Sequence, residues 1–139
     1  YVAFRGGGEA TAAILGGNVT IGGSGYSEFA EYINTGKMRA IAVTSDARLK
    51  GVNVPTLKEQ GVNVVLGNWR GVFGAAGITA DQAKALTEMV VKATKSKAWG
   101  EALEKNNWTP ALLTGPAFGT FVDEEFASLR AVMVKSGML

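Results

Sequence analysis

The chain has 139 residues, with 14 Lys and Arg against 12 Asp and Glu, and it contains neither Cys nor His. Without Cys it has no disulfide framework, thiol nucleophile or Cys-bound metal, and without His it has no Ser–His–Asp triad, imidazole base or His-based metal site. The basic residues are dispersed and do not alternate with aromatic ones, so the chain is not a nucleic-acid-binding surface. We therefore expect a protein that binds through its backbone, uses no metal or cofactor, and is not an enzyme.

The first half of the chain alternates helix-forming segments with short β-branched ones. Two helices are predicted, at Glu9 to Leu15 and at Ser27 to Asn34, and each is followed by a glycine that ends it. A short helix follows at Leu57 to Gln60. The predicted strands lie between these helices, at Tyr1 to Arg5, Val19 to Ile21, Met38 to Thr44, Val62 to Leu66 and, less regularly, Asn68 to Ala75.

The second half is mainly helical. Thr79 to Gln82 fits a capping box at the start of one helix, and Ser96 is placed to cap the next. A strand is predicted at Trp108 to Leu113, and a last helix begins at Thr114-Gly115-Pro116 and ends at Gly137. Its inward face is predicted to carry Phe118, Phe121, Val122, Phe126, Leu129, Val132 and Met133.

Strands that alternate with helices predict an α/β fold with a parallel or mixed sheet covered on both faces. The helices after Gly77 also need a sheet to cover, and we expect the strands before Gly77 not to suffice for both sets. The chain begins at Tyr1 with residues typical of a strand, without Met or a signal-peptide pattern. We therefore expect a processed chain or, rather, a fragment of a longer protein.

A first candidate site lies in Phe4 to Thr11, where Gly6, Gly7 and Gly8 separate a predicted strand from a helix start. Glycines let the backbone approach a ligand closely, and the unpaired N–H groups of a helix start carry about half a positive charge, which suits a carboxylate or phosphate. The segment has no Walker A lysine, and Thr11 stands where a dinucleotide fingerprint has glycine or alanine. The alternative is a tight strand-to-helix turn that needs positive φ and binds nothing.

A second candidate is Gly22 to Ser27, which again joins a strand to a helix. In a parallel sheet both glycine loops would emerge at the carboxyl ends of neighbouring strands, where open α/β folds bind ligands. Ser24, Ser27 and the Tyr26 hydroxyl could add hydrogen-bond donors. The alternative is a flexible connector in which Ser27 is a plain N-cap.

Other polar and aromatic groups give no sign of chemistry. We predict solvated helix surfaces for the carboxylates of Glu28, Glu31 and Asp123 to Glu125, because no metal-ligand spacing or acid–base partner accompanies them. We predict core or hinge packing, rather than a sugar-stacking platform, for Trp69, Trp99 and Trp108.

Six runs of residues occur in a characteristic order and spacing: Tyr1 to Ala10, Leu15 to Val19, Gly36 to Ser45, Val54 to Gly61, Asn68 to Gly71 and Trp108 to Gly137. Together they resemble the tripartite tricarboxylate transporter substrate-binding proteins, the Bug family, over essentially the whole chain. Ser24-Gly25-Tyr26 with Glu28-Phe29 is similar to the tricarboxylate-binding branch.

This resemblance implies a periplasmic, two-lobed receptor of the type II periplasmic-binding-protein kind. Such a receptor captures a carboxylate anion through backbone amides, often with bridging waters, and delivers it to membrane permease subunits. Residues 1–77 would be the α/β ligand-binding second lobe, and residues 78–139 a mostly helical segment that returns to a first lobe absent here. The ligand-binding residues implied in the two loops are Arg5, Gly6, Gly7, Gly8, Glu9, Ala10, Ser24, Gly25 and Tyr26.

The sequence also departs from the family pattern. The N-terminal lobe and its own carboxylate loop are absent, Arg5 stands where the family commonly has Lys, and Thr20 where many relatives have Asp. The side chain of Glu9 would repel an anion, so only its backbone amide is a candidate contact.

We therefore predict an extracytoplasmic solute-binding protein for a di- or tricarboxylate such as citrate. The alternative is an effector-binding lobe of a two-lobed transcriptional regulator, which would have a helix-turn-helix upstream in place of a secretory signal. An anion-handling enzyme lobe is disfavoured, because only Lys or a carboxylate could serve as its base. We also expect the truncated chain on its own to bind weakly or to self-associate, because its apolar faces are uncovered.

Overall fold

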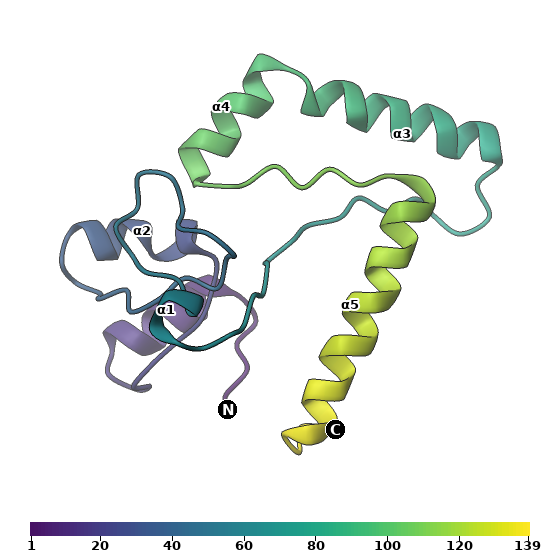
Figure 1. The fold of residues 1–139 in the computed structure, drawn as a ribbon. Coiled ribbons are helices and arrows are strands. Elements are labelled where there is room, and N and C mark those ends of the chain that lie inside the picture. Colours follow the sequence, from purple (N-terminus) through teal and green to yellow (C-terminus); the bar gives the residue numbers. More distant parts are fainter. The chain divides into compact units, whose positions relative to one another are not determined.

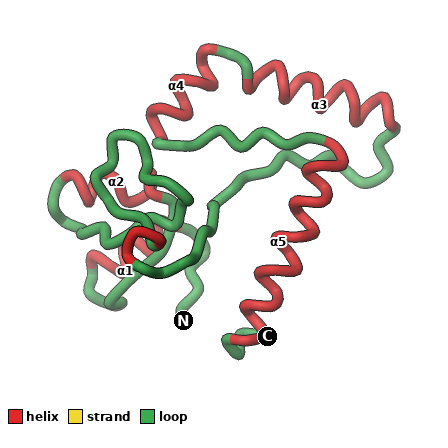
Figure 2. The backbone as a smooth tube through the Cα atoms, viewed as in Figure 1, coloured by secondary structure: helices red, strands yellow, loops and turns green.

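The computed structural model describes residues 1–139 and contains five α-helices and one 3-10 helix (Figures 1 and 2). The elements are α1 (Gly7–Leu15), α2 (Tyr26–Asn34), η1 (Lys58–Gln60), α3 (Ala80–Thr94), α4 (Lys97–Asn106) and α5 (Gly115–Lys135). The chain forms two compact units, the first comprising Tyr1–Val72 with Gly100–Trp108 and the second Phe73–Trp99 with Thr109–Leu139. The assignment of residues 1–77 and 78–139 to two lobes of a larger receptor stays a prediction.

In the first unit α1 and α2 pack against each other. In the loop between them, Gly22 leaves room for the Ile14 side chain of α1, because a Cβ at Gly22 would lie only 2.5 Å from that side chain. Ala10 and Thr11 of α1 are among the few buried residues. Both predicted helices are confirmed, and the chain leaves them through Gly17 at φ 70° and Gly36 at φ 73°, the left-handed geometry that glycine adopts at least strain.

Three segments lie side by side in the rest of the first unit. Val43 forms an isolated parallel bridge with Thr56, in which the Val43 amide donates to Pro55 and the Leu57 amide donates to Val43. On the other side, the Leu66 amide donates to the Thr44 carbonyl at 2.9 Å. These pairings are too short to make strands.

The predicted parallel or mixed sheet is therefore not confirmed, and no predicted strand forms in the structure (Figure 2). A strand exists only where a neighbouring chain pairs its backbone N–H and C=O groups over several residues. Here the β-branched segment Val62 to Leu66 is about half exposed at each of its large apolar side chains. The apolar pattern is present, but within this chain the pairing partners are not.

The short helix η1 is held by a local network of hydrogen bonds that the sequence did not predict. The Glu59 carboxylate accepts the Thr56 amide at 2.7 Å and the Arg48 guanidinium at 2.8 and 3.0 Å, while the Thr56 hydroxyl accepts the Glu59 amide at 3.1 Å. The Arg48 guanidinium and the Thr56 amide together lower the pKa of Glu59 from 4.5 to about 2. Lys58 pairs with Asp46 at 2.6 Å, and this ammonium lowers the pKa of that carboxyl.

The segment Gly100–Trp108 joins the first unit late in the chain. The Arg70 guanidinium lies 5.4 Å from the ring centre of Trp108, and the Asn107 side chain donates to the Lys50 carbonyl at 3.5 Å. Trp108 and Trp99 are each 38% exposed, so neither is buried in a core, and hinge packing, the other half of the prediction, stays a prediction. Trp108 instead serves as the face for a cation–π contact.

In the second unit the predicted helix starts are confirmed. The Thr79 amide donates to Gln82 Oε1 at 2.9 Å and the Gln82 amide to Thr79 Oγ1 at 3.2 Å, which is the predicted capping box. Ser96 Oγ accepts the Trp99 amide at 3.2 Å at the start of α4. No helix in the structure is both long enough and apolar enough to cross a membrane.

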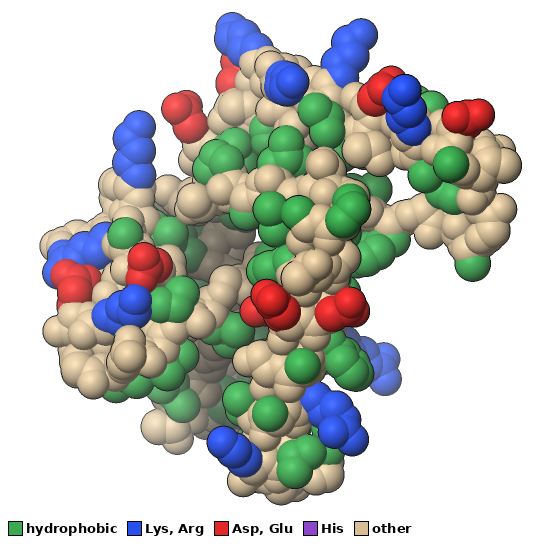
Figure 3. Space-filling model, turned by 45° about the vertical axis from the view of Figure 1, so that its right-hand side comes forward, with side chains coloured by type: hydrophobic (Ala, Val, Ile, Leu, Met, Phe, Trp, Pro, Cys, Tyr) green, Lys and Arg blue, Asp and Glu red, His purple; other side chains and the backbone are tan.

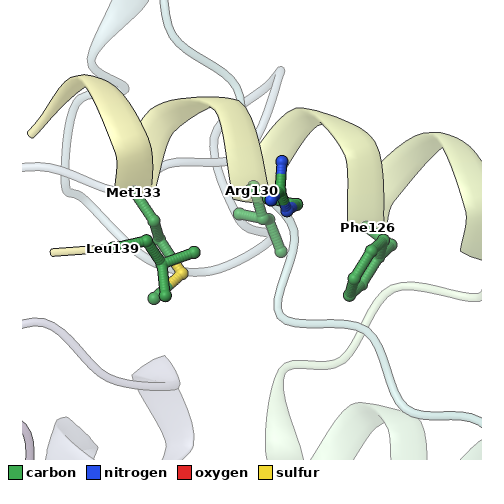
Figure 4. A pocket seen from close by; sticks show the side chains of 5 residues that line it. Phe126, Arg130, Met133 and Leu139 are labelled. Carbon is green, nitrogen blue, oxygen red and sulfur yellow. The ribbon is translucent and has the colours of Figure 1, made fainter.

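The apolar face of α5 is largely uncovered. Phe118 meets Phe73 at 5.4 Å between ring centres, but Phe126 is 69% exposed and Val132 56%, so the prediction that they point inward is wrong for this chain. Figure 4 shows Phe126 and Met133 extending from α5, with Leu139 folded back beside Met133. They line a hollow of about 280 Å³, and groups of apolar side chains are exposed at several places on the face shown in Figure 3.

Candidate anion-binding site

The first glycine loop forms the first turn of α1, which begins at Gly7, two residues earlier than predicted. The first helical hydrogen bond runs from the Ala10 amide to the Gly6 carbonyl, so the amides of Gly7, Gly8 and Glu9 have no acceptor within the helix. The Glu9 carboxylate turns back and accepts the Arg5 amide at 3.0 Å. The free amides at this helix start therefore resemble the anion-binding arrangement expected from the sequence.

The three glycines are not explained by backbone conformation. None of Gly6, Gly7 and Gly8 lies in the left-handed region, and Gly6, at φ 168° and ψ 174°, is extended. The alternative of a turn that needs left-handed geometry is therefore wrong. What Gly7 provides is space, because an added Cβ would lie 2.2 Å from the Glu28 carboxyl carbon and 2.3 and 2.4 Å from its oxygens.

The second loop is organised around the same Glu28 carboxylate. Glu28 Oε2 accepts the Gly25 amide at 3.2 Å and also the Ser24 hydroxyl. Asn68 also lies against this loop, since a Cβ at Gly25 would lie 3.3 Å from Asn68 Nδ2. Glu28 is exposed, as predicted for a solvated carboxylate, and in addition it touches both glycine loops.

The two loops border one open hollow of about 770 Å³ in the first unit. Of the predicted site residues, the hollow is lined by Gly6, Gly7, Ala10 and Ser24. The others lie at the same two helix starts but not on its wall: Arg5, Gly8, Glu9, Gly25 and Tyr26. The apolar side chains on its wall include Val2, Phe4, Val19 and Ile21.

Sequence reasoning missed two residues, Glu28 and Asn68. Glu28 stands three residues after the N-cap Gly25, the position from which an acidic side chain reaches back to cap a helix start. Asn68 lies in the run Asn68 to Gly71, which carries part of the family pattern but no chemical signal of its own. No group of acidic residues in the structure could hold a metal ion.

Comparison with solved structures identifies the class of fold. The chain is similar to a TctC solute-binding protein from Polaromonas, solved without ligand, at a TM-score of 0.63 and 30% identity. The match covers 96% of this chain and 47% of that one. The fold is therefore that of part of a solute-binding protein, although this chain pairs no strands of its own.

Comparison of sequences gives the family. Residues 1–138 match the model of the tripartite tricarboxylate transporter family receptor, TctC, and the chain belongs to this family. It is 28% identical over 138 residues to protein BugT of Bordetella pertussis and 25% identical over 139 residues to the UPF0065 protein in the gbd 5' region of Cupriavidus necator. The matches cover 98% and 99% of this chain but 42% of each relative, so the chain spans about two fifths of their length.

The alternative of a transcriptional-regulator lobe gains no support from these matches. The family model describes a transporter receptor, and the structural relative is a solute-binding protein.

Proposed function

We propose that this chain is the C-terminal portion of a periplasmic solute-binding receptor that captures a di- or tricarboxylate of the citrate kind. The receptor would pass its ligand, unchanged, to the membrane permease subunits of a tripartite tricarboxylate transporter. The observation that supports this most directly is that two glycine loops, each leading into a helix, border one hollow in a member of the transporter-receptor family.

The chemistry of the site supports binding without catalysis. A carboxylate at the α1 start could accept from the amides that have no helical partner, those of Gly7, Gly8 and Glu9, and would meet the favourable end of the helix dipole. Gly6 presents bare backbone to the hollow, and a Cβ there would meet no atom within 4 Å, so an anion could approach closely at this residue. The Glu9 side chain accepts the Arg5 amide at 3.0 Å, so only the backbone amide of Glu9 is a candidate contact for the anion.

Binding can be tested on the full-length protein by isothermal titration calorimetry and thermal shift with citrate and other small di- and tricarboxylates. A ligand at about 100 times its Kd should raise the free energy of unfolding by about 2.7 kcal/mol. If no carboxylate binds, the proposal is wrong.

The variant Gly6→Val tests whether the anion binds at the hollow. Gly6 is extended and a Cβ there meets no atom within 4 Å, so valine is tolerated by the fold but fills part of the hollow beside the helix start. We expect at least a tenfold loss of carboxylate affinity with an unchanged melting temperature. Normal affinity in this variant would mean that the anion binds elsewhere.

A further inference from the structure

Ser24 is the one hydroxyl of the second loop that both lines the hollow and has a defined hydrogen-bond direction. Ser24 lines the hollow together with Gly22 and Gly23, and its only hydroxyl hydrogen is donated to Glu28 Oε2. A serine hydroxyl has one hydrogen and two acceptor lone pairs. Toward the hollow, Ser24 can therefore only accept, contrary to the prediction that it adds a donor.

Glu28 holds Ser24 in this state because the carboxylate is fixed from two further sides. The Gly25 amide donates to the same oxygen at 3.2 Å, and the carboxylate rests against the bare Cα of Gly7 at the start of α1. An ionised carboxylate accepts hydrogen bonds and donates none. While these contacts stand, the Ser24 hydrogen stays directed to Glu28.

We propose that Glu28 is a positioning residue that sets ligand specificity by turning Ser24 into a hydrogen-bond acceptor. The site then favours carboxylates that also carry a donor, a hydroxyl or an ammonium group, over plain polycarboxylates of the same skeleton. The inference rests on the proposed function and adds to it the second functional group of the ligand, a hydrogen-bond donor beside the carboxylates.

Matched ligands test this inference directly on the full-length protein. Citrate and tricarballylate differ only in one hydroxyl, as do malate and succinate, and aspartate replaces that hydroxyl with an ammonium. Because a single hydrogen bond in water contributes a modest net amount, we expect calorimetry to give a preference of about five- to tenfold for the donor-bearing member of a pair.

The variants separate positioning from general stability. Ser24→Ala removes the acceptor and should bring the affinity ratio close to one. Glu28→Ala should do the same, because the freed hydroxyl can then donate to either ligand. Glu28→Gln should retain the preference, since a single amide oxygen can accept from both Ser24 and Gly25. Glu31→Ala is the control, because it removes the same exposed carboxylate one turn further along α2.

The outcomes distinguish this inference from the proposed function. If no carboxylate binds the unmodified protein, the proposed function fails and this inference with it. If carboxylates bind without preference for the donor, or if Ser24→Ala keeps the preference, the inference is overturned while the function stands. If circular dichroism shows that Glu28→Ala does not fold, Ser24→Ala and Glu28→Gln decide alone. The inference is supported if Ser24→Ala loses the preference for the donor-bearing ligand and Glu28→Gln keeps it. Any other pair of results overturns the inference.

Discussion

Gly7→Ala should destabilise the first unit although alanine is the better helix former. The added methyl would lie 2.2 to 2.4 Å from the Glu28 carboxylate, whereas ordinary contact begins at 3.4 Å, so the carboxylate must retreat by about 1 Å or more. The Gly25 bond is already 3.2 Å long and would break, and the Ser24 bond would break or bend. Two such hydrogen bonds contribute about 1–3 kcal/mol together. Alanine's higher helix propensity returns up to about 1 kcal/mol.

We therefore expect the unfolding free energy to fall by about 1 kcal/mol, measured by urea denaturation with far-UV circular dichroism on the full-length protein. Gly8→Ala is the matched control, because Gly8 lies on the same helical turn and a Cβ there meets no atom within 4 Å. That change should be neutral or stabilising. In a Glu28→Ala background, Gly7→Ala should behave like Gly8→Ala, giving a coupling of about 1–2 kcal/mol. Equal effects of Gly7→Ala in both backgrounds would refute the argument.

Two further predictions concern other parts of the chain. The pKa of Glu59 is lowered from 4.5 to about 2, so its contribution to stability is fully present above pH 4.5 and is lost as the pH falls toward 2; the stability difference between the unmodified protein and Glu59→Gln should shrink over this range in urea titrations, and a constant difference would contradict it. The isolated 139-residue chain should self-associate through the exposed face of α5, so its sedimentation coefficient should rise with protein concentration. Phe126→Ser should reduce this self-association, because Phe126 is 69% exposed. A chain that stays monomeric at all concentrations would argue against this.

The helices and their caps were predictable because their signals are local. Thr79 and Gln82 lie within one turn of each other and cap the same helix start. Gly17 and Gly36 mark helix ends because glycine adopts the left-handed conformation without help from distant residues. The sheet was not predictable from this chain, because apolar segments such as Val62 to Leu66 show a tendency to pair but not which backbone, if any, pairs with them.

The candidate site shows the same division. The sequence placed glycines at two helix starts and predicted that they would come together, and Gly6, Gly7 and Ser24 do line one hollow. It did not predict that Glu28 would join the loops, because an acidic residue early in a helix is usually solvated. Only the contact with Gly7, 21 positions earlier in the chain, shows the difference.

The discontinuity of the first unit has a consequence for its folding during synthesis. The chain leaves this unit after Val72 and supplies its last piece only at Gly100–Trp108. That piece contacts the rest of the unit through Trp108 with Arg70 and through Asn107 with Lys50, 57 positions earlier in the chain. Such contacts close long loops, and they form late because the ribosome releases the chain N-terminus first. A ribosome halted before Trp108 would therefore hold α1, α2 and both glycine loops, but not the contacts that complete their unit.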